Sequence, residues 1–219
     1  MLKTKGLTSH SPKALLLLSG GFDSAVAAHL MQQKGLQLTA LHFYNKHLSD
    51  INTIEKCKIL CQKLKIKKLF LIPFDEEQAE LVRKCEHRLY FVLMRRLMLR
   101  IAEQLAKKEK CIYLITGENL GQVASQTLSN MTNTTKAVKM PILRPLLCYD
   151  KSEIMNLAKK IDTYETSKGP EICCLLGPKH PATKTSLREI EYEEKKILLN
   201  KLISGCLKNA ELHSIFQKD

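Results

Sequence analysis

Residues Ala14-Leu-Leu-Leu-Leu-Ser-Gly-Gly-Phe-Asp-Ser24 decide the fold class of this chain. The apolar run Ala14–Leu18 is short and continuous and ends at two glycines, which is typical of a strand buried on both faces. A helix is predicted directly after it, over residues 23–34, with Gly35 in the position that ends a helix. A buried strand that turns sharply into a helix is the first unit of an open α/β sheet.

The same alternation of strand and helix continues along the chain. Further strands are predicted at 36–43, 67–72 and 111–116, with helices at 51–64, over 75–110 and from 150 onward. Asp75 with Gln78, and Asp150 with Glu153, have the spacing of capping boxes. The stretch 75–110 is expected to break near 84–88, because one uninterrupted helix would be unusually long. The order predicts a Rossmann-like open parallel sheet with helices on both faces.

Composition indicates one basic, globular domain. The 219 residues hold 35 Lys and Arg against 22 Asp and Glu, a net charge of +13 that favours a phosphate-rich partner. The absence of Trp argues against base-stacking platforms. The first twelve residues are polar and no apolar run is long enough for export or a membrane span, so a cytoplasmic protein without a membrane partner is expected. Its eight cysteines should then be reduced, and their spacing favours no zinc site.

The loop Ser19–Ser24 predicts a phosphate site. Gly20 and Gly21 let backbone amides turn toward an anion, two serine hydroxyls add donors, and the helix N-terminus adds positive potential. The alternative is a plain turn in which Asp23 or Ser24 caps the helix. Without the Walker lysine or the GxGxxG spacing, an ordinary P-loop kinase or a dinucleotide enzyme is disfavoured.

SGGFDS at Ser19–Ser24 resembles the signature of the PP-loop ATP pyrophosphatases, which cleave ATP to AMP and pyrophosphate. Thr116-Gly-Glu-Asn-Leu-Gly-Gln-Val-Ala-Ser-Gln-Thr-Leu128 is similar to a segment of the tRNA 4-thiouridine sulfurtransferases. Leu143-Arg-Pro-Leu146 and Pro181-Ala-Thr-Lys184 follow in the order of that family. The resemblance covers 13–184 and implies a PP-loop fold, like the adenine nucleotide alpha hydrolases, that uses ATP and Mg²⁺.

The predicted organisation is an N-terminal tail over 1–12, a catalytic PP-loop domain over 13–184, and a helical extension over 185–219 packed on the same domain. Members of the family normally add a ferredoxin-like region and a THUMP domain that grips tRNA, and some add a rhodanese domain. The chain is expected to lack these domains, because its length leaves no room for them.

The resemblance also implies the residues that contact ATP. They are Leu17, Leu18, Ser19, Gly20, Gly21, Asp23, Ser24, His42, Phe43, Arg95, Gly117 and Gln126. Asp23 is assigned a catalytic role, holding Mg²⁺ against pyrophosphate, with helix capping as the alternative. For His42 the alternative is a buried core histidine, and for Arg95 a solvated helix face. No metal site built from protein ligands alone is predicted.

Cys173 matches the catalytic cysteine of the family and lies in a segment bounded by Gly and Pro, Gly169–Pro178. Its neighbour Cys174 is a poor disulfide partner, since a disulfide between adjacent residues is strained. An iron–sulfur cluster held by Cys173, Cys174 and a third thiol is left open. Cys57 and Cys61 fall on one helical face and are expected in the core.

The resemblance implies that the chain is an ATP-dependent tRNA sulfurtransferase. It would adenylate a uridine of tRNA and insert persulfide sulfur to make 4-thiouridine, with tRNA and a persulfide donor such as a cysteine desulfurase as partners. One alternative is thiolation of a sulfur carrier or a thiamine thiazole precursor. The other is an ATP-binding subunit that needs a separate THUMP protein. The oligomeric state stays open, a homodimer included.

Overall fold

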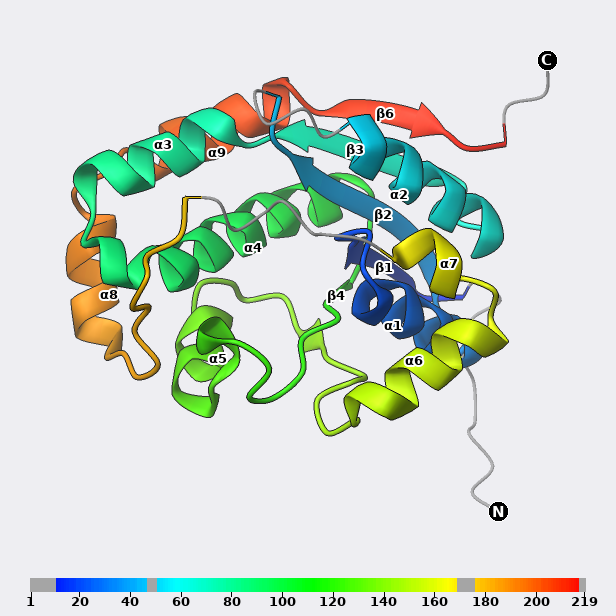
Figure 1. The fold of residues 1–219 in the computed structure, drawn as a ribbon. Coiled ribbons are helices and arrows are strands. Elements are labelled where there is room, and N and C mark those ends of the chain that lie inside the picture. Colours follow the sequence, from blue (N-terminus) through cyan, green and yellow to red (C-terminus); the bar gives the residue numbers. More distant parts are fainter. Residues whose placement is uncertain (1–10, 47–50, 169–175, 217–219) are drawn as a thin grey trace, which may run out of the picture.

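The computed structural model describes residues 11–46, 51–168 and 176–216, and in them a six-stranded sheet forms the centre of the molecule (Figure 1). Its order is β5-β4-β1-β2-β3-β6. The strands are β1 (Lys13–Leu17), β2 (Gln37–Tyr44), β3 (Lys68–Pro73), β4 (Tyr113–Ile115), β5 (Ile142–Leu143) and β6 (Glu211–Ser214). All the pairings are parallel except that of β3 with β6. The predicted open α/β sheet is confirmed, with β5 and the antiparallel edge strand β6 added.

Helices cover both faces of the sheet, as predicted. One face packs against α1 (Phe22–Gln33), α2 (Ile51–Lys63), α6 (Lys151–Lys160) and α7 (Tyr164–Ser167). The other packs against α3 (Asp75–Lys84), α4 (Tyr90–Lys108), α8 (Leu187–Glu194) and α9 (Leu199–Lys208). The short elements η1 (His87–Leu89), η2 (Ala124–Gln126) and α5 (Leu128–Thr135) complete the described chain. None of the helices described is long and apolar enough to cross a membrane.

The strand β1 explains why the helices lie on two sides. Leu15 and Leu17 are buried against the α4 side, whereas Ala14 and Leu16 are buried against the α1 side. Successive strand residues point to opposite faces, so a run that is apolar at every position needs a cover on both. The continuous run predicted this arrangement correctly.

Two helix boundaries test the capping predictions. The box at Asp150 and Glu153 is confirmed, and the Asp150 amide donates to a Glu153 carboxylate oxygen at 2.8 Å. The box predicted at Asp75 and Gln78 is wrong. The N-cap of α3 is Phe74, which has no capping side chain, and the Gln78 side chain bonds elsewhere. The predicted break near 84–88 is confirmed, because α3 ends at Lys84 and α4 begins at Tyr90.

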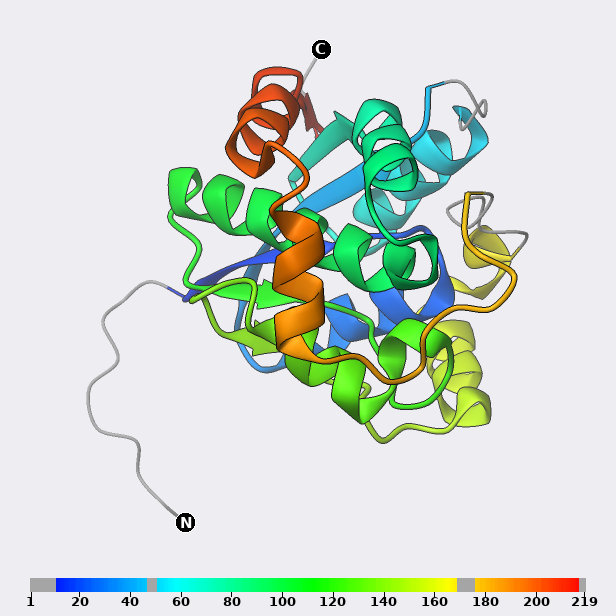
Figure 2. The same cartoon turned by 90° about the vertical axis from the view of Figure 1, so that its left-hand side faces the viewer.

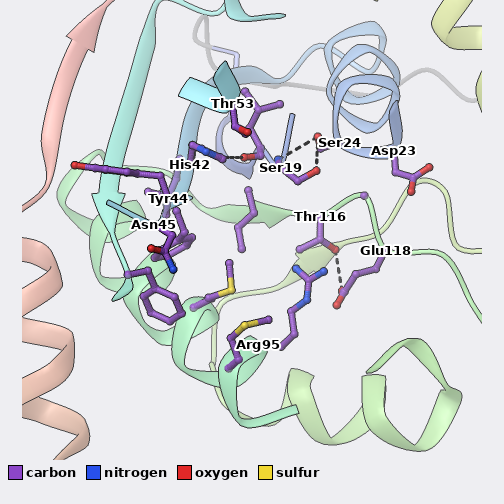
Figure 3. A pocket seen from close by; sticks show the side chains of 18 of the residues that line it. Ser19, Asp23, Ser24, His42, Tyr44, Asn45, Thr53, Arg95, Thr116 and Glu118 are labelled. Carbon is purple, nitrogen blue, oxygen red and sulfur yellow. Dashed lines mark hydrogen bonds between the residues drawn. The ribbon is translucent and has the colours of Figure 1, made fainter. Parts of the chain in front are cut away.

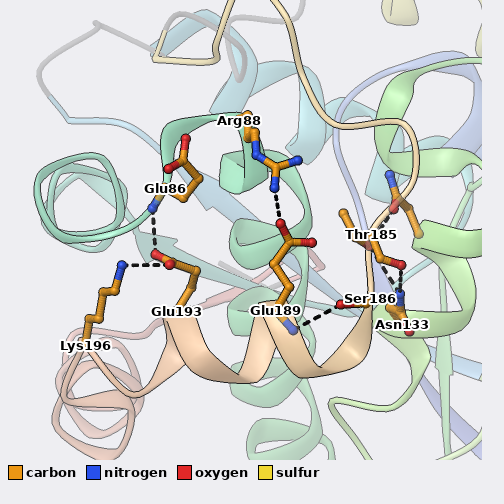
Figure 4. A network of polar contacts seen from close by, with 9 residues as sticks. Glu86, Arg88, Asn133, Thr185, Ser186, Glu189, Glu193 and Lys196 are labelled. Atoms are coloured by element: carbon orange, nitrogen blue, oxygen red, sulfur yellow. Dashed lines mark hydrogen bonds and ion pairs between the residues drawn. The ribbon is translucent and has the colours of Figure 1, made fainter.

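The chain beyond residue 176 is fastened to α4 and α5 by polar contacts. Asn133 donates to the Thr185 carbonyl at 2.8 Å, and the Ser186 hydroxyl accepts from the Glu189 amide at the start of α8 (Figure 4). Figure 2 shows α8 in front of the sheet on this side. Glu194 at the end of α8 then accepts from two nitrogens of Arg96, at 2.7 and 2.9 Å.

The sheet order also locates a switch point. After β1 the chain continues to β2 on one side of the sheet, and after β4 it continues to β5 on the other side. The chain therefore leaves the neighbouring strands β1 and β4 in opposite directions. Leu16 lies opposite Ile115, which brings the loops after β1 and β4 to the same level. In open α/β sheets, ligands bind at such a point.

We predict that Glu194→Ala lowers the free energy of unfolding by about 3 to 5 kcal/mol, because it leaves the Arg96 guanidinium, 1% exposed, without its carboxylate. Urea denaturation followed by circular dichroism measures this. Glu191→Ala, on the exposed side of α8, is the matched control and should change stability by less than about 0.5 kcal/mol. Equal effects of the two substitutions would contradict the structural role of the Glu194 pair.

Candidate functional site

A pocket lies at the carboxyl ends of β1, β2 and β4, with α4 along one side (Figure 3). Of the predicted ATP contacts, all but Gly20 and Gly21 line it. The residues predicted and found there are Leu17, Leu18, Ser19, Asp23, Ser24, His42, Phe43, Arg95, Gly117 and Gln126. The other lining residues, which were not among the predicted ATP contacts, are Leu41, Tyr44, Asn45, Thr53, Phe74, Gln78, Met94, Met98, Thr116, Glu118 and Leu176.

Ser24 organises the loop between β1 and α1. Its hydroxyl donates to the Gly21 carbonyl at 3.1 Å and accepts from the Ser19 amide at 3.2 Å. The N-cap of α1 is Gly21, with no side-chain cap. The alternative of a helix capped by Asp23 or Ser24 is therefore wrong, and the start of α1 is left for a ligand at the pocket.

Gly20 of this loop packs closely against α2. Gly20 has a φ of +89°, a conformation that favours glycine. A Cβ there would lie 3.2 Å from the Lys56 side chain and 3.4 Å from that of Thr53. The ammonium group of Lys56 donates to the Lys168 carbonyl at 3.1 Å. Lys56 thus packs against Gly20 and also forms a hydrogen bond to the residue that ends α7.

Gly117, after β4, comes closer to the loop than any side chain would permit. A Cβ at Gly117 would lie 2.6 Å from the Asp23 carbonyl carbon and 2.6 Å from the Ser24 nitrogen. Because both are backbone atoms, they have no rotamer with which to move aside. The loops after β1 and β4 therefore meet backbone to backbone.

Asp23 stands at this contact, in the first turn of α1. Burial raises the pKa of its carboxyl group, and the positive charge of Lys151 offsets only part of this effect. Asp23 lines the pocket, and Lys151 is the charged residue that lowers its pKa.

His42 is both a core residue and a pocket residue. It is 4% exposed, and its Nδ1 lies 2.8 Å from the Leu18 carbonyl oxygen. A carbonyl accepts only, so Nδ1 carries the proton in this contact. The two interpretations of His42 are compatible, since a buried bond to β1 fixes a ring that also lines the pocket.

A buried ion cluster lies beside Arg95. Glu118 is 3% exposed, accepts from Arg144 Nε at 2.7 Å and accepts from the Thr116 hydroxyl at 2.9 Å. Burial alone would raise the pKa of Glu118, but the charges of Arg95 and Arg144 and these two hydrogen bonds outweigh it and lower the pKa. Arg95 extends from α4 toward this carboxylate (Figure 3), so the solvated helix face is not its position.

The other end of the pocket is apolar, with two amides. The rings of Phe43 and Phe74 pack with their centroids 5.1 Å apart. The Asn45 amide donates to Gln78 Oε1 at 3.1 Å, and Gln78 Nε2 lies 3.8 Å from the Met94 sulfur. Phe43 was among the predicted ATP contacts, whereas no sequence signal marked Phe74 or Gln78 as lining the pocket.

Cys173 and Cys174 lie outside the described residues, and the described cysteines are mostly unsuited to sulfur transfer. Cys57 and Cys61 are buried in the core, as predicted. Burial raises the pKa of Cys61 to about 12 and that of Cys111 to about 11, which suppresses the reactive thiolate. Cys148 is exposed. No group of three or more His, Cys, Asp or Glu in the described ranges could hold a metal ion.

The SGGFDS turn lies at the switch point of an open α/β sheet and faces a pocket that is polar at one end and apolar at the other. These features together define the PP-loop class of Rossmann-like proteins. Residues 9–199 match the family described as thiamine biosynthesis protein (ThiI), and the chain belongs to this family. The family-level resemblance carried by residues 19–24 and 116–128 is confirmed.

Relatives and one solved structure agree with this assignment. A probable tRNA sulfurtransferase of Moorella thermoacetica is 43% identical, matching 93% of this chain and 54% of its own length. One of Acetivibrio thermocellus is 42% identical, matching 93% and 53%. The crystal structure of a 4-thiouridine synthetase–RNA complex with bound ATP superposes with a TM-score of 0.88 at 32% identity, covering 92% of this chain and 55% of that one. The chain thus spans about half the length of the relatives it matches.

We predict that Gly117→Ala lowers the free energy of unfolding by about 1 to 3 kcal/mol, the usual cost of overpacking, because its methyl group meets the backbone of Asp23 and Ser24. Urea denaturation measures the change. Gly205→Ala, with nothing within 4 Å of the new Cβ inside α9, is the control and should be neutral or stabilising by up to about 1 kcal/mol. A Gly117→Ala protein as stable as the wild type would refute the close contact.

We predict that Glu118→Gln destabilises the protein by about 2 kcal/mol at neutral pH, through loss of charged hydrogen bonds. The lowered pKa of Glu118 means that its ionised form stabilises the fold fully above the ordinary value of 4.5. This contribution is lost as the pH falls through the folded-state pKa. Stability curves of both proteins between pH 7 and pH 3 should therefore converge on the acid side, and a constant difference would contradict the assignment.

Proposed function

We propose that this chain supplies the ATP-dependent catalytic domain of a tRNA sulfurtransferase that makes 4-thiouridine. The observation that carries the proposal is the backbone contact between the loop Ser19–Ser24 and Gly117, which joins the two sequence signatures in one pocket. The names of the relatives and the ATP and RNA in the similar crystal structure support it.

ATP fits the two ends of the pocket. The start of α1 and the serine hydroxyls suit the phosphates, and the apolar end at Phe43 and Phe74 suits the base. In the proposed first step, O4 of a tRNA uridine attacks the α-phosphorus of ATP, the bond to the β-phosphate oxygen breaks, and pyrophosphate leaves. Arg95, directed by Glu118, is placed to hold phosphate oxygens during this step.

Mg²⁺ fits the phosphate end through Asp23. A nucleotide-bound Mg²⁺ uses one or two protein carboxylates together with phosphate oxygens and water, so one aspartate is sufficient. Asp23 supplies such a carboxylate, since it lines the pocket from the first turn of α1, the end that suits the phosphates. When bound, the ion would neutralise charge on the departing pyrophosphate.

The second proposed step uses Cys173. Sulfur carried as a persulfide on Cys173 attacks C4 of the adenylated uridine, and AMP leaves with the oxygen. The uridine is then joined to Cys173 through a disulfide. A second thiol attacks Cys173 Sγ and releases the thiouridine, and a thiol reductant reduces the disulfide that this leaves between the two thiols. Leu176 lines the pocket and follows Cys173 by three residues in the sequence, and three residues of any chain reach at most about 10 Å. The proposed partners are tRNA and a cytoplasmic persulfide donor. The net charge of +13 suits binding to tRNA phosphates.

We predict that deleting the gene removes 4-thiouridine from bulk tRNA, as measured by mass spectrometry of nucleosides. The wild-type gene should restore it, Cys173→Ala should not, and the matched control Cys148→Ala should. With purified protein, ATP–pyrophosphate exchange should depend on tRNA and survive Cys173→Ala, because adenylation precedes sulfur transfer. Unchanged 4-thiouridine in the deletion strain, or full restoration by Cys173→Ala, would overturn the proposal.

A further inference from the structure

Leu176 and Gly177 are held against the start of α4 by two ring side chains. Leu176 lines the pocket, and its carbonyl oxygen accepts a hydrogen bond from His87 Nε2 at 2.8 Å. Gly177 faces the ring of Phe91. A Cβ at Gly177 would lie 2.9 Å from Phe91 Cε2 and 3.0 Å from Cε1, and closer still to Cζ, so the ring leaves no room for a side chain. The wall of the pocket at Leu176 therefore depends on how Gly177 packs on Phe91.

The Phe91 ring has a fixed support. It packs edge to face with Tyr90, the ring centroids being 5.4 Å apart, and Tyr90 is 1% exposed. The chain is fastened to the same region a second time where the Ala182 amide donates to the Arg88 carbonyl at 2.9 Å. Residues 176–182, drawn in gold in Figure 1, therefore follow the start of α4 between two attachments.

Phe91 lies on the side of α4 that carries pocket residues. It precedes Arg95 by four residues, and residues four apart on a helix lie one above the other. Met94 and Arg95 line the pocket, whereas Phe91 does not. Phe91 therefore acts on the site through Gly177 rather than by touching a ligand. The same helix carries the guanidinium that is placed to hold phosphate oxygens and the ring that supports the pocket wall.

The sulfur-transfer step needs these two parts of α4 in a fixed relation. Cys173 is three residues from Leu176 in the sequence, so the place of Leu176 limits the region that Cys173 can reach to within about 10 Å. Sulfur on Cys173 must meet C4 of a uridine whose adenylate phosphate is held at Arg95. Reacting groups have to be placed closely, and a misplacement of about 1 Å can cost roughly 100-fold in rate. The rate of this step therefore depends on the distance between Leu176 and Arg95.

We propose that Phe91 is a positioning residue for sulfur transfer. By supporting Gly177 on the helix that carries Arg95, it keeps Cys173 within reach of the adenylated uridine. This inference rests on the proposed function, since it needs Cys173 as the sulfur carrier.

Adenylation does not need the contact of Phe91 with Gly177. α4 is held in place independently by Arg96, whose guanidinium is bound to Glu194. Loss of the contact therefore slows thiolation and leaves adenylation at its normal rate. A residue that only stabilised the fold would change both rates together.

The experiment measures the two steps separately in the purified full chain with Mg·ATP, tRNA, a thiol reductant, and a cysteine desulfurase with cysteine as the persulfide donor. ATP–pyrophosphate exchange that depends on tRNA reports adenylation, and mass spectrometry of nucleosides reports the rate of 4-thiouridine formation at saturating ATP and tRNA. Phe91→Ala should lower thiolation at least tenfold and change exchange by less than twofold. Tyr192→Ala removes a ring that is 64% exposed on α8 and, as the matched control, should keep both rates.

A second set of variants tests the contact itself. Gly177→Ala places a methyl group against the Phe91 ring and should lower thiolation at least tenfold with exchange unchanged. Leucine lacks the Cε and Cζ atoms that Gly177 faces. Adding Phe91→Leu to Gly177→Ala therefore makes room for the methyl group and should restore thiolation to within threefold of the wild type. Gly205→Ala, with nothing within 4 Å of the new Cβ, is the control for the single glycine change and should keep both rates.

The outcomes separate this inference from the proposed function. Exchange and thiolation that fall together in a folded Phe91→Ala protein would overturn the role of Phe91 alone. Full thiolation by a folded Gly177→Ala protein, or no recovery in the double variant, would do the same, and these two proteins carry the test if Phe91→Ala does not fold. A wild-type chain without tRNA-dependent exchange, or full thiolation by Cys173→Ala, would overturn the proposed function and this inference with it.

Discussion

The backbone contact of Gly117 with Asp23 and Ser24 is the constraint on which the rest of the site depends. It exists only because residue 117 has no side chain, and it fixes the loop after β4 against the start of α1. This contact also fixes the positions of the pocket residues that follow Gly117 in the chain. Glu118 is placed within reach of Arg144 and Arg95, and Gln126 accepts from the Asn119 amide at 3.3 Å while lining the pocket.

A second layer of support comes from α4. Two adjacent arginines on this helix have different partners. Arg95 faces the pocket and the Glu118 carboxylate, whereas Arg96 is buried under α8 and bound to Glu194. The distant C-terminal part of the chain therefore stabilises the same helix that supplies the pocket with its cation. A buried pair of this kind matters less as a source of net stability than as a fixed register between two helices.

Features with a local sequence pattern, such as apolar runs and one of the two capping boxes, were predicted correctly. Features that depend on residues distant in the sequence were missed. The apolar run at 14–18 predicted a two-faced sheet correctly, and Asp150 with Glu153 marked a true helix start. β6 was missed because Glu211–Ser214 is mostly exposed and gains its strand form only by pairing with β3. Gln78 was interpreted as a cap because spacing alone cannot show that its partner is Asn45, 33 residues earlier. The role of Cys173 stays a prediction.

The two arginines also bear on how α4 can change over evolution. Successive residues of an α-helix differ by about 100° in direction, and this rotation separates the pocket side of α4 from its α8 side. Inserting one residue ahead of Arg95 would turn Arg95 to the α8 side and leave the pocket without its guanidinium, whereas deleting one would turn Arg96 to the pocket and place Leu97 opposite Glu194. The tolerance of α4 for insertions and deletions should accordingly be far lower than its tolerance for substitution.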